Sequence, residues 1–200
     1  MSPHDPRTHA ADANDEAVGP RESERLRLRC EAWIAAGDPE QARVAGHAAL
    51  AQAMREAASQ QPDWQGQLAR CQSTLASACV ELEEWDAAHD LLTHALANLE
   101  GEAPGAPSAG AERLRERAYV LHARGMVAHA RQEWAAAEAD YRDALALREA
   151  YLPAEHPDLA KSLSDLARLF AEQGGDREAV AAWLARAERI VASALAIADS

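Results

Sequence analysis

The stretch Gly125–Leu145, GMVAHARQEWAAAEADYRDAL, decides the fold of this chain because its spacing of small and large residues recurs elsewhere in the sequence. Gly125 is followed twelve positions later by Ala137. Small residues at both positions allow two helix backbones to approach closely. The same separation joins three further pairs of small residues: Cys30 and Ala42, Ala76 and Ala88, and Ala167 and Ala179. A helical unit repeated in this way indicates a stacked array of helix pairs.

The large side chains of the repeat fall at matching offsets and are interpreted as packing residues rather than as a cofactor site. The offset that holds Tyr141 holds Leu92 and Trp183 in two other copies, whereas the first copy departs from the pattern with Gly46. Most of the aromatic residues occupy such packing positions: Trp33, Trp85, Trp134, Tyr141, Phe170 and Trp183.

The composition favours an all-α fold. The chain has 200 residues and is 48% hydrophobic, and much of that fraction is alanine, the strongest helix former. No segment alternates apolar and polar residues as a strand would. Breaks at proline, glycine and aspartate divide the chain into about four antiparallel helix-turn-helix pairs. The predicted helices cover 23–36, 39–59, 64–82, 84–99, 111–131, 133–150, 157–173 and 176–198.

The predicted domain organisation is a single helical repeat domain over residues 23–200, preceded by a tail. Residues 1–22 lack large apolar side chains, and we expect them to be disordered. Residues 101–110, GEAPGAPSAG, are expected to form a flexible loop inside the domain.

The charge and the termini restrict location and partners. A formal net charge of −13 disfavours binding to nucleic acid or to an anionic membrane, and suggests a basic partner. The N-terminus lacks a secretory signal and no segment is long and apolar enough to span a membrane, so we predict a cytoplasmic protein. Its three cysteines, Cys30, Cys71 and Cys79, are expected to be buried free thiols.

The sequence gives no indication of catalysis. It contains no GxGxxG, GxxxxGK[ST], HExxH or GxSxG pattern. The nearby histidine pairs in predicted helices, His89 with His94 and His122 with His129, lack the i,i+4 spacing of metal ligands. We predict that the protein is not an enzyme and requires no cofactor or metal.

The chain resembles a tetratricopeptide repeat protein, and residues 118–190 resemble the longer repeats of the kinesin light chain type. The resemblance implies a right-handed α-solenoid that serves as a non-catalytic protein–protein interaction module. It is carried by residues along the second half of the chain: Ala137, Tyr141, Ala144, Leu145, Arg148, Glu149, His156, Pro157, Leu163, Leu166, Ala167, Gln173 and Gly174.

The resemblance also implies that the first helix of each pair lines a groove for a peptide or protein partner. Tyr119, His122, Met126 and His129 share one helical face and form the centre of the expected platform. The alternative is that Tyr119 and Met126 pack against the neighbouring repeat. The complete predicted groove comprises Arg70, Ser73, Ser77, Tyr119, His122, Met126, His129, Lys161, Ser164 and Arg168.

The last predicted helix carries a second candidate interface, an apolar stripe that includes Trp183, Ile190, Val191 and Ala194. This stripe either folds back on the fourth helix pair or docks on another chain, including a second copy of this one. Two functions follow. The first is a scaffold or adaptor that binds a segment in its groove. The second is a small chaperone-like or regulatory subunit of a bacterial assembly, docked through the last helix.

Overall fold

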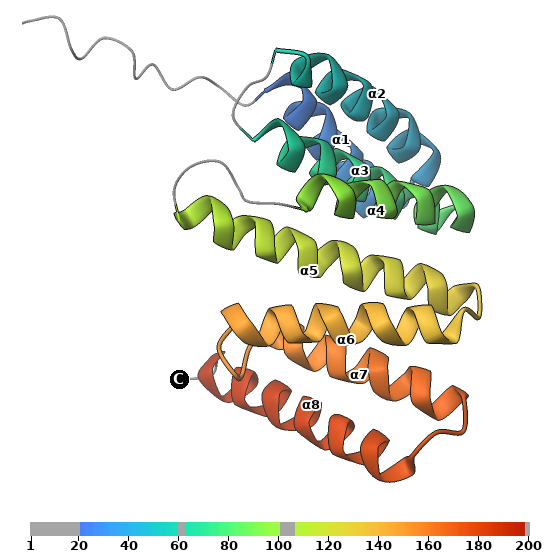
Figure 1. Ribbon diagram of the computed structural model, residues 1–200, viewed down its shortest axis with the longest axis vertical. Coiled ribbons are helices and arrows are strands. Elements are labelled where there is room, and N and C mark those ends of the chain that lie inside the picture. The colour runs from blue at the N-terminus through green and yellow to red at the C-terminus, as the bar shows by residue number, and fades with distance from the viewer. Residues whose placement is uncertain (1–20, 60–62, 101–106, 199–200) are drawn as a thin grey trace, which may run out of the picture.

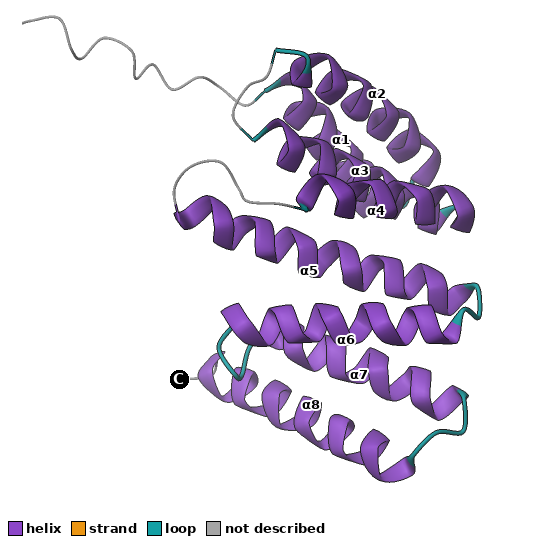
Figure 2. Cartoon of the chain, in the orientation of Figure 1, coloured by secondary structure: helices purple, strands orange, loops and turns teal. Residues whose placement is uncertain are grey.

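The computed structural model describes residues 21–59, 63–100 and 107–198, and within these ranges it contains eight α-helices and no strand (Figures 1 and 2). Each odd-numbered helix packs against the next helix in the chain, and successive pairs contact each other through α2 and α3, α4 and α5, and α6 and α7. The helices are α1 (Glu22–Ala35), α2 (Pro39–Ala57), α3 (Trp64–Glu81), α4 (Trp85–Leu99), α5 (Pro107–Ala130), α6 (Trp134–Tyr151), α7 (Pro157–Glu172) and α8 (Arg177–Ala198). The predicted all-α solenoid of four helix pairs is confirmed.

Local signals in the sequence set the helix ends. Gly37 adopts a φ of 73°, which reverses the chain after α1. Asp38 then caps α2, because its Oδ1 accepts a hydrogen bond from the backbone N–H of Gln41 at 3.0 Å. Proline occupies the first position of both α2 and α7, where no backbone N–H is needed.

Two boundaries differ from the prediction. Helix α5 begins at Pro107 rather than near residue 111, so the expected loop 101–110 is helical in its last part. Proline is well suited to a first helical position, and Ala109 and Ala111 support a helix. The remainder of that expected loop, residues 101–106, lies outside the described residues. So does the expected tail, except for its end, since Glu22 already begins α1.

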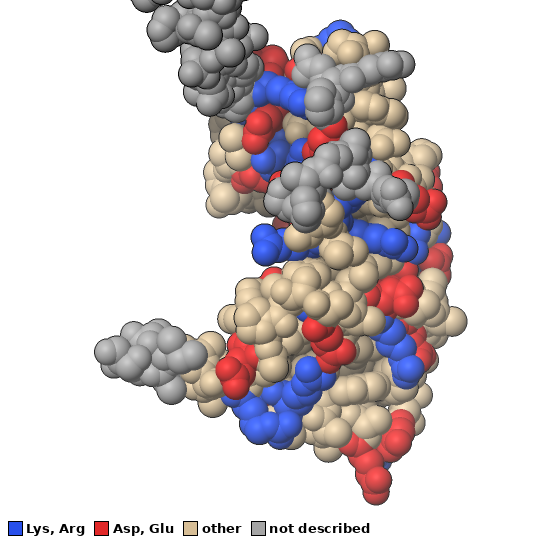
Figure 3. Space-filling model, turned by 60° about the vertical axis from the view of Figure 1, so that its left-hand side comes forward, with Lys and Arg blue, Asp and Glu red and all other residues tan. Residues whose placement is uncertain are grey.

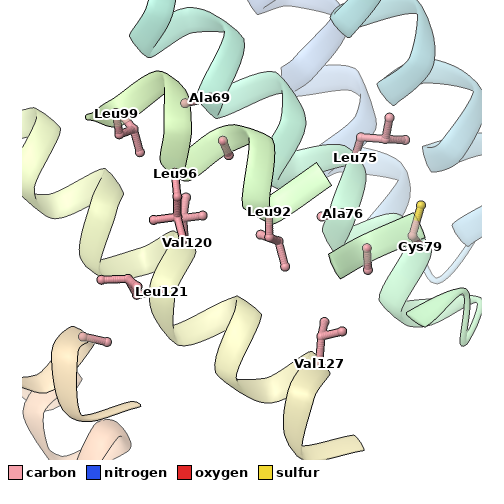
Figure 4. Close-up of a cluster of buried hydrophobic side chains, with 13 residues drawn as sticks. Ala69, Leu75, Ala76, Cys79, Leu92, Leu96, Leu99, Val120, Leu121 and Val127 are labelled. Carbon is pink, nitrogen blue, oxygen red and sulfur yellow. The ribbon is translucent and has the colours of Figure 1, made fainter. Parts of the chain in front are cut away.

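The core is built largely from alanine and leucine, with one large aromatic group in the third pair. In Figure 4, Leu92 and Leu96 of α4 belong to the same buried cluster as Val120 and Val127 of α5. Tyr141 is fully buried in a second cluster against α7. A Cβ at Gly125 would lie 2.7 Å from Tyr141 Cδ1, so only glycine fits beside this ring.

The departure at Gly46 has a structural reason. A Cβ at this position would lie 2.8 Å from Leu75 Cδ1 and 3.3 Å from Cys30 Sγ. Leu75 of α3 therefore occupies the space into which a bulky side chain at position 46 of α2 would extend.

The three cysteines are buried and free, as the sequence predicts. Burial raises the pKa of Cys30 and Cys79 to about 11 and that of Cys71 to about 12. The thiols are therefore protonated at neutral pH and serve as small apolar packing groups. None of the described helices combines the length and apolar character needed to cross a bilayer.

Candidate functional site

One face of α5 presents two large side chains to solvent. Tyr119 is 47% exposed and Met126 is 37% exposed. They lie seven positions apart, or two helical turns, and so point in the same direction. Tyr119 Oη is 3.3 Å from Ser77 Oγ of α3, which ties the tyrosine to the preceding repeat without burying its ring.

The two histidines of the predicted platform are buried, unlike Tyr119 and Met126. His122 is only 3% exposed and His129 only 9%, so the expected stripe is exposed only at Tyr119 and Met126. His122 Nε2 lies 3.1 Å from Asp165 Oδ2, although the two groups are not aligned for a hydrogen bond. His129 Nε2 lies 2.8 Å from Glu172 Oε2. Both histidines therefore connect α5 to α7.

The surroundings of His122 favour its neutral form. Burial lowers its pKa, and the nearby cations Arg148 of α6 and Lys161 of α7 act in the same direction, while Asp165 opposes them. A lowered histidine pKa means that the unfolded chain binds more protons than the folded chain as the pH falls below about 6.5. The contribution of His122 to stability is thus present at neutral pH and lost on acidification.

We expect His122→Asn to make the free energy of unfolding depend less on pH below neutrality. Because the variant has no group to protonate at this site, its urea midpoint should fall less than that of the wild type between about pH 7.5 and about pH 5.5. The measurement is chemical unfolding followed by circular dichroism at the two pH values. Parallel falls in wild type and variant would show that His122 is not responsible for acid sensitivity in this range.

Some of the other predicted groove residues form hydrogen bonds within the protein, and others are exposed to solvent. Ser73 is buried and donates a hydrogen bond to Glu116 Oε1 at 3.0 Å. Arg70 is partly buried, and its Nη2 donates to Asp63 Oδ2 at 2.9 Å. The exposed members on α7 are Lys161, Ser164 and Arg168. The last of these pairs with Asp165 at 3.0 Å.

A hollow of about 420 Å³ opens beside Met126 and is here named the α5 hollow. Two tryptophans at the starts of α4 and α6 form part of its wall, and an arginine and a glutamate of α7 border it. Its lining residues are Val80, Trp85, Met126, His129, Ala130, Gln132, Trp134, Arg168 and Glu172. An apolar depression with a few polar groups at its edge is suited to hold a side chain of a bound segment.

The sequence prediction did not include Trp85 and Trp134 in the site. Both are half-buried and pack against the core, as predicted, yet each also contributes to the α5 hollow. Their common position at the start of a second helix is the signal that links them. The repeat brings these two helix starts to the same end of neighbouring pairs.

The residues of the docking stripe predicted on α8 do not all lie on one side of the helix. Some pack against the fourth helix pair, and others face solvent. Ile190 is buried against α7, and Trp183 packs edge-on to Phe170 with ring centroids 4.9 Å apart. Val191 is exposed and Ala194 is half-buried. The stripe therefore folds back on the fourth pair through Trp183 and Ile190. Among the α8 side chains whose burial is described, the large apolar ones that are exposed are Leu184, Val191 and Leu195.

Comparison with known proteins agrees with this architecture. Residues 116–193 match the family described as tetratricopeptide repeat. No curated protein matches the chain. BtubC (BKLC) from P. vanneervenii is similar in structure, with a TM-score of 0.69 and 18% identity over 86% of this chain and 63% of that one. The apo form of RapI has a TM-score of 0.69 and 16% identity, over 90% of this chain and 59% of its own.

Repeats of the kinesin light chain type are also among the similar structures. A putative kinesin light chain from Podosopora anserina, with nearly identical TPR-like repeats, has a TM-score of 0.59 and 20% identity, over 86% of this chain and 76% of that one. Identities this low show the fold alone, and this chain spans less than two thirds of BtubC and RapI. Residues 116–193 therefore form tetratricopeptide repeats, and the earlier helix pairs continue the same solenoid.

Proposed function

We propose that this protein is a non-catalytic interaction module that binds a peptide or protein segment along the exposed face of α5. The observation that carries the proposal is the exposed Met126 in the lining of the α5 hollow, to which Trp85 and Trp134 also contribute. Tetratricopeptide repeats generally serve as scaffolds for protein interactions, and the fold supports that coarse function. The buried free thiols suit a reducing, cytoplasmic setting.

The chemistry of the α5 hollow suits an apolar anchor residue of the partner. Methionine adapts its shape to different apolar groups, and tryptophan offers a large rigid contact surface. Arg168 and Glu172 at the border offer one cation and one anion for the polar backbone or side chains beside the anchor. Such a combination of an apolar centre with a polar rim is typical of sites where a few residues supply most of the binding energy.

We expect Met126→Glu to weaken this binding. Peptides would be selected from a phage-displayed random library on the purified wild-type protein, and their dissociation constants measured by fluorescence polarisation. Because the glutamate places a charge at an apolar contact, affinity should fall by at least about tenfold, equivalent to about 1.4 kcal/mol.

Met54→Glu provides the matched control. Met54 is also an exposed methionine, at 62%, but it lies on α2, away from the α5 hollow. The selected peptides should bind this variant as they bind the wild type. If the library yields no specific peptide, or if both glutamate variants bind equally well, the α5 face is not the binding site.

A second function has its own observation in α8. The exposed Leu184, Val191 and Leu195 support docking of this protein, as a subunit, on a larger assembly or on a second copy. Sedimentation velocity on the full-length chain tests self-association directly. A concentration-dependent dimer that Leu195→Glu dissociates would support the homodimer, and a monomer at high concentration for the wild type would eliminate it.

A further inference from the structure

A second hollow, of about 480 Å³, lies where the first half of α5 passes the end of α6 and the start of α7. It is distinct from the α5 hollow and shares no lining residue with it. We name it the cationic hollow after its two arginines. The residues that line it are Arg115, Tyr119, Arg148, Tyr151, Leu152, Pro153, His156 and Asp158.

Arg148 is the buried cation of this hollow. It is only 5% exposed, and its Nη1 donates to Ser162 Oγ at 2.5 Å and to the Asp158 carbonyl oxygen at 3.4 Å. These partners are neutral, and no carboxylate in the described part of the chain forms an ion pair with the guanidinium. A buried charge without a counter-charge is costly, so an anion that reached this group would gain a strong interaction.

Arg115 adds a second cation at the open side of the hollow. Its Cζ lies 6.0 Å from the centre of the Tyr151 ring, so the aromatic face orients the side chain. Across the described ranges, Arg115 has no carboxylate partner either. Figure 3 shows Lys and Arg side chains gathered across the middle of this face, at the level where Figure 1 places α5.

Neither arginine of the hollow has an acidic partner among the described residues, although the chain has 33 acidic and 20 basic residues. Arg142 makes the contrast clear, because it lies over the Phe170 ring at 5.6 Å and also pairs with Glu138 at 3.0 Å. The one carboxylate that lines the cationic hollow, among the described residues, is that of Asp158, whose Oδ2 lies 3.8 Å from His156 Nδ1.

We infer that the cationic hollow binds an oxyanion carried by the partner segment, either an Asp or Glu carboxylate or the phosphate of a phosphorylated residue. Planar guanidinium groups bind both kinds of oxyanion through paired N–H donors. Tyr119 connects this hollow to the α5 face, two helical turns from Met126, so one segment would reach both. The inference deepens the proposed function, on which it rests, by naming the chemistry of the partner. It also replaces the expectation of a basic partner with that of a locally acidic one.

The test uses the ¹⁵N-labelled full-length protein and small probes, so it does not depend on peptide binding at the α5 hollow. The probes are N-acetylglutamate N-methylamide, the neutral glutamine analogue, and N-acetylphosphoserine N-methylamide. We expect saturable NMR shifts at Arg115, Tyr119 and Tyr151 with an anionic probe and none with the glutamine analogue. Arg115→Ala should lower the affinity for the anionic probe by about tenfold, because it removes a charge-assisted contact.

Arg142→Ala is the matched control, since it removes an arginine that also lies over an aromatic ring but is already paired. It should leave the affinity for the probes unchanged. Saturation by either anion supports the inference, and tighter binding of the phosphoserine probe identifies phosphate as the source. Equal shifts with the glutamine analogue, no saturation with either anion, or unchanged affinity in Arg115→Ala would overturn it. A failed peptide selection beside a positive anion titration would instead remove the proposed function alone.

Discussion

Replacing Tyr141 by alanine is expected to lower the free energy of unfolding by about 4 kcal/mol, the cost of removing a large aromatic group from a packed core. Tyr141 is fully buried, and it packs between Ala128 and Ala137 of its own pair and Leu166 of α7. Its ring also lies directly against Gly125, so the cavity would open where α5, α6 and α7 meet. Urea unfolding monitored by circular dichroism measures the loss.

The phenylalanine variant separates packing from hydrogen bonding. Tyr141 Oη is buried, and no described residue forms a hydrogen bond with it. Tyr141→Phe should therefore be close to neutral, because it removes an unsatisfied polar atom and keeps the ring. In a solenoid each repeat contacts only its neighbours, so hydrogen exchange in Tyr141→Ala should accelerate in α5–α7 and remain near wild type in α1 and α2. A loss of protection spread evenly over all helices would contradict this local role.

The helices could be predicted because their signals are local in sequence. Asp38 and Pro39 specify the start of α2 through a cap and a fixed φ, and these signals act whatever lies around the helix. The small residues at twelve-residue spacing then specify which helices pair. The predicted start of α5 is too late, because a segment rich in Gly, Pro and Ser favours a loop by composition although its proline is suited to begin a helix.

The candidate site could be predicted only in part, because exposure depends on how one repeat lies on the next. The helical spacing correctly places His122 and Met126 on one side of α5. It does not show that Asp165 of α7 approaches closely enough to cover His122 while Met126 stays exposed. Arg148 illustrates the same limit, since its lack of a carboxylate partner among the described residues is a property of three helices packed together.

Gly46→Leu is expected to destabilise the protein by about 3 kcal/mol, although it restores the bulky residue that the repeat pattern has at this offset. Leucine would recover up to about 1 kcal/mol in helix propensity over glycine. That gain is outweighed because even a Cβ at this position lies 2.8 Å from Leu75 Cδ1, and Leu75 is fully buried. The added side chain must therefore push α2 away from α3. The loss should appear as a lower thermal midpoint and a lower urea midpoint.

Gly110→Leu is the matched control, because Gly110 is also a helical glycine but a Cβ there would meet no atom within 4 Å. This variant should be neutral or more stable by up to about 1 kcal/mol, since it gains helix propensity without a clash. Opposite signs for the two substitutions would show that packing against Leu75, rather than the repeat pattern, determines which residue α2 tolerates at position 46. A Gly46→Leu protein as stable as the wild type would mean that α2 and α3 do not pack as closely as the structure has them.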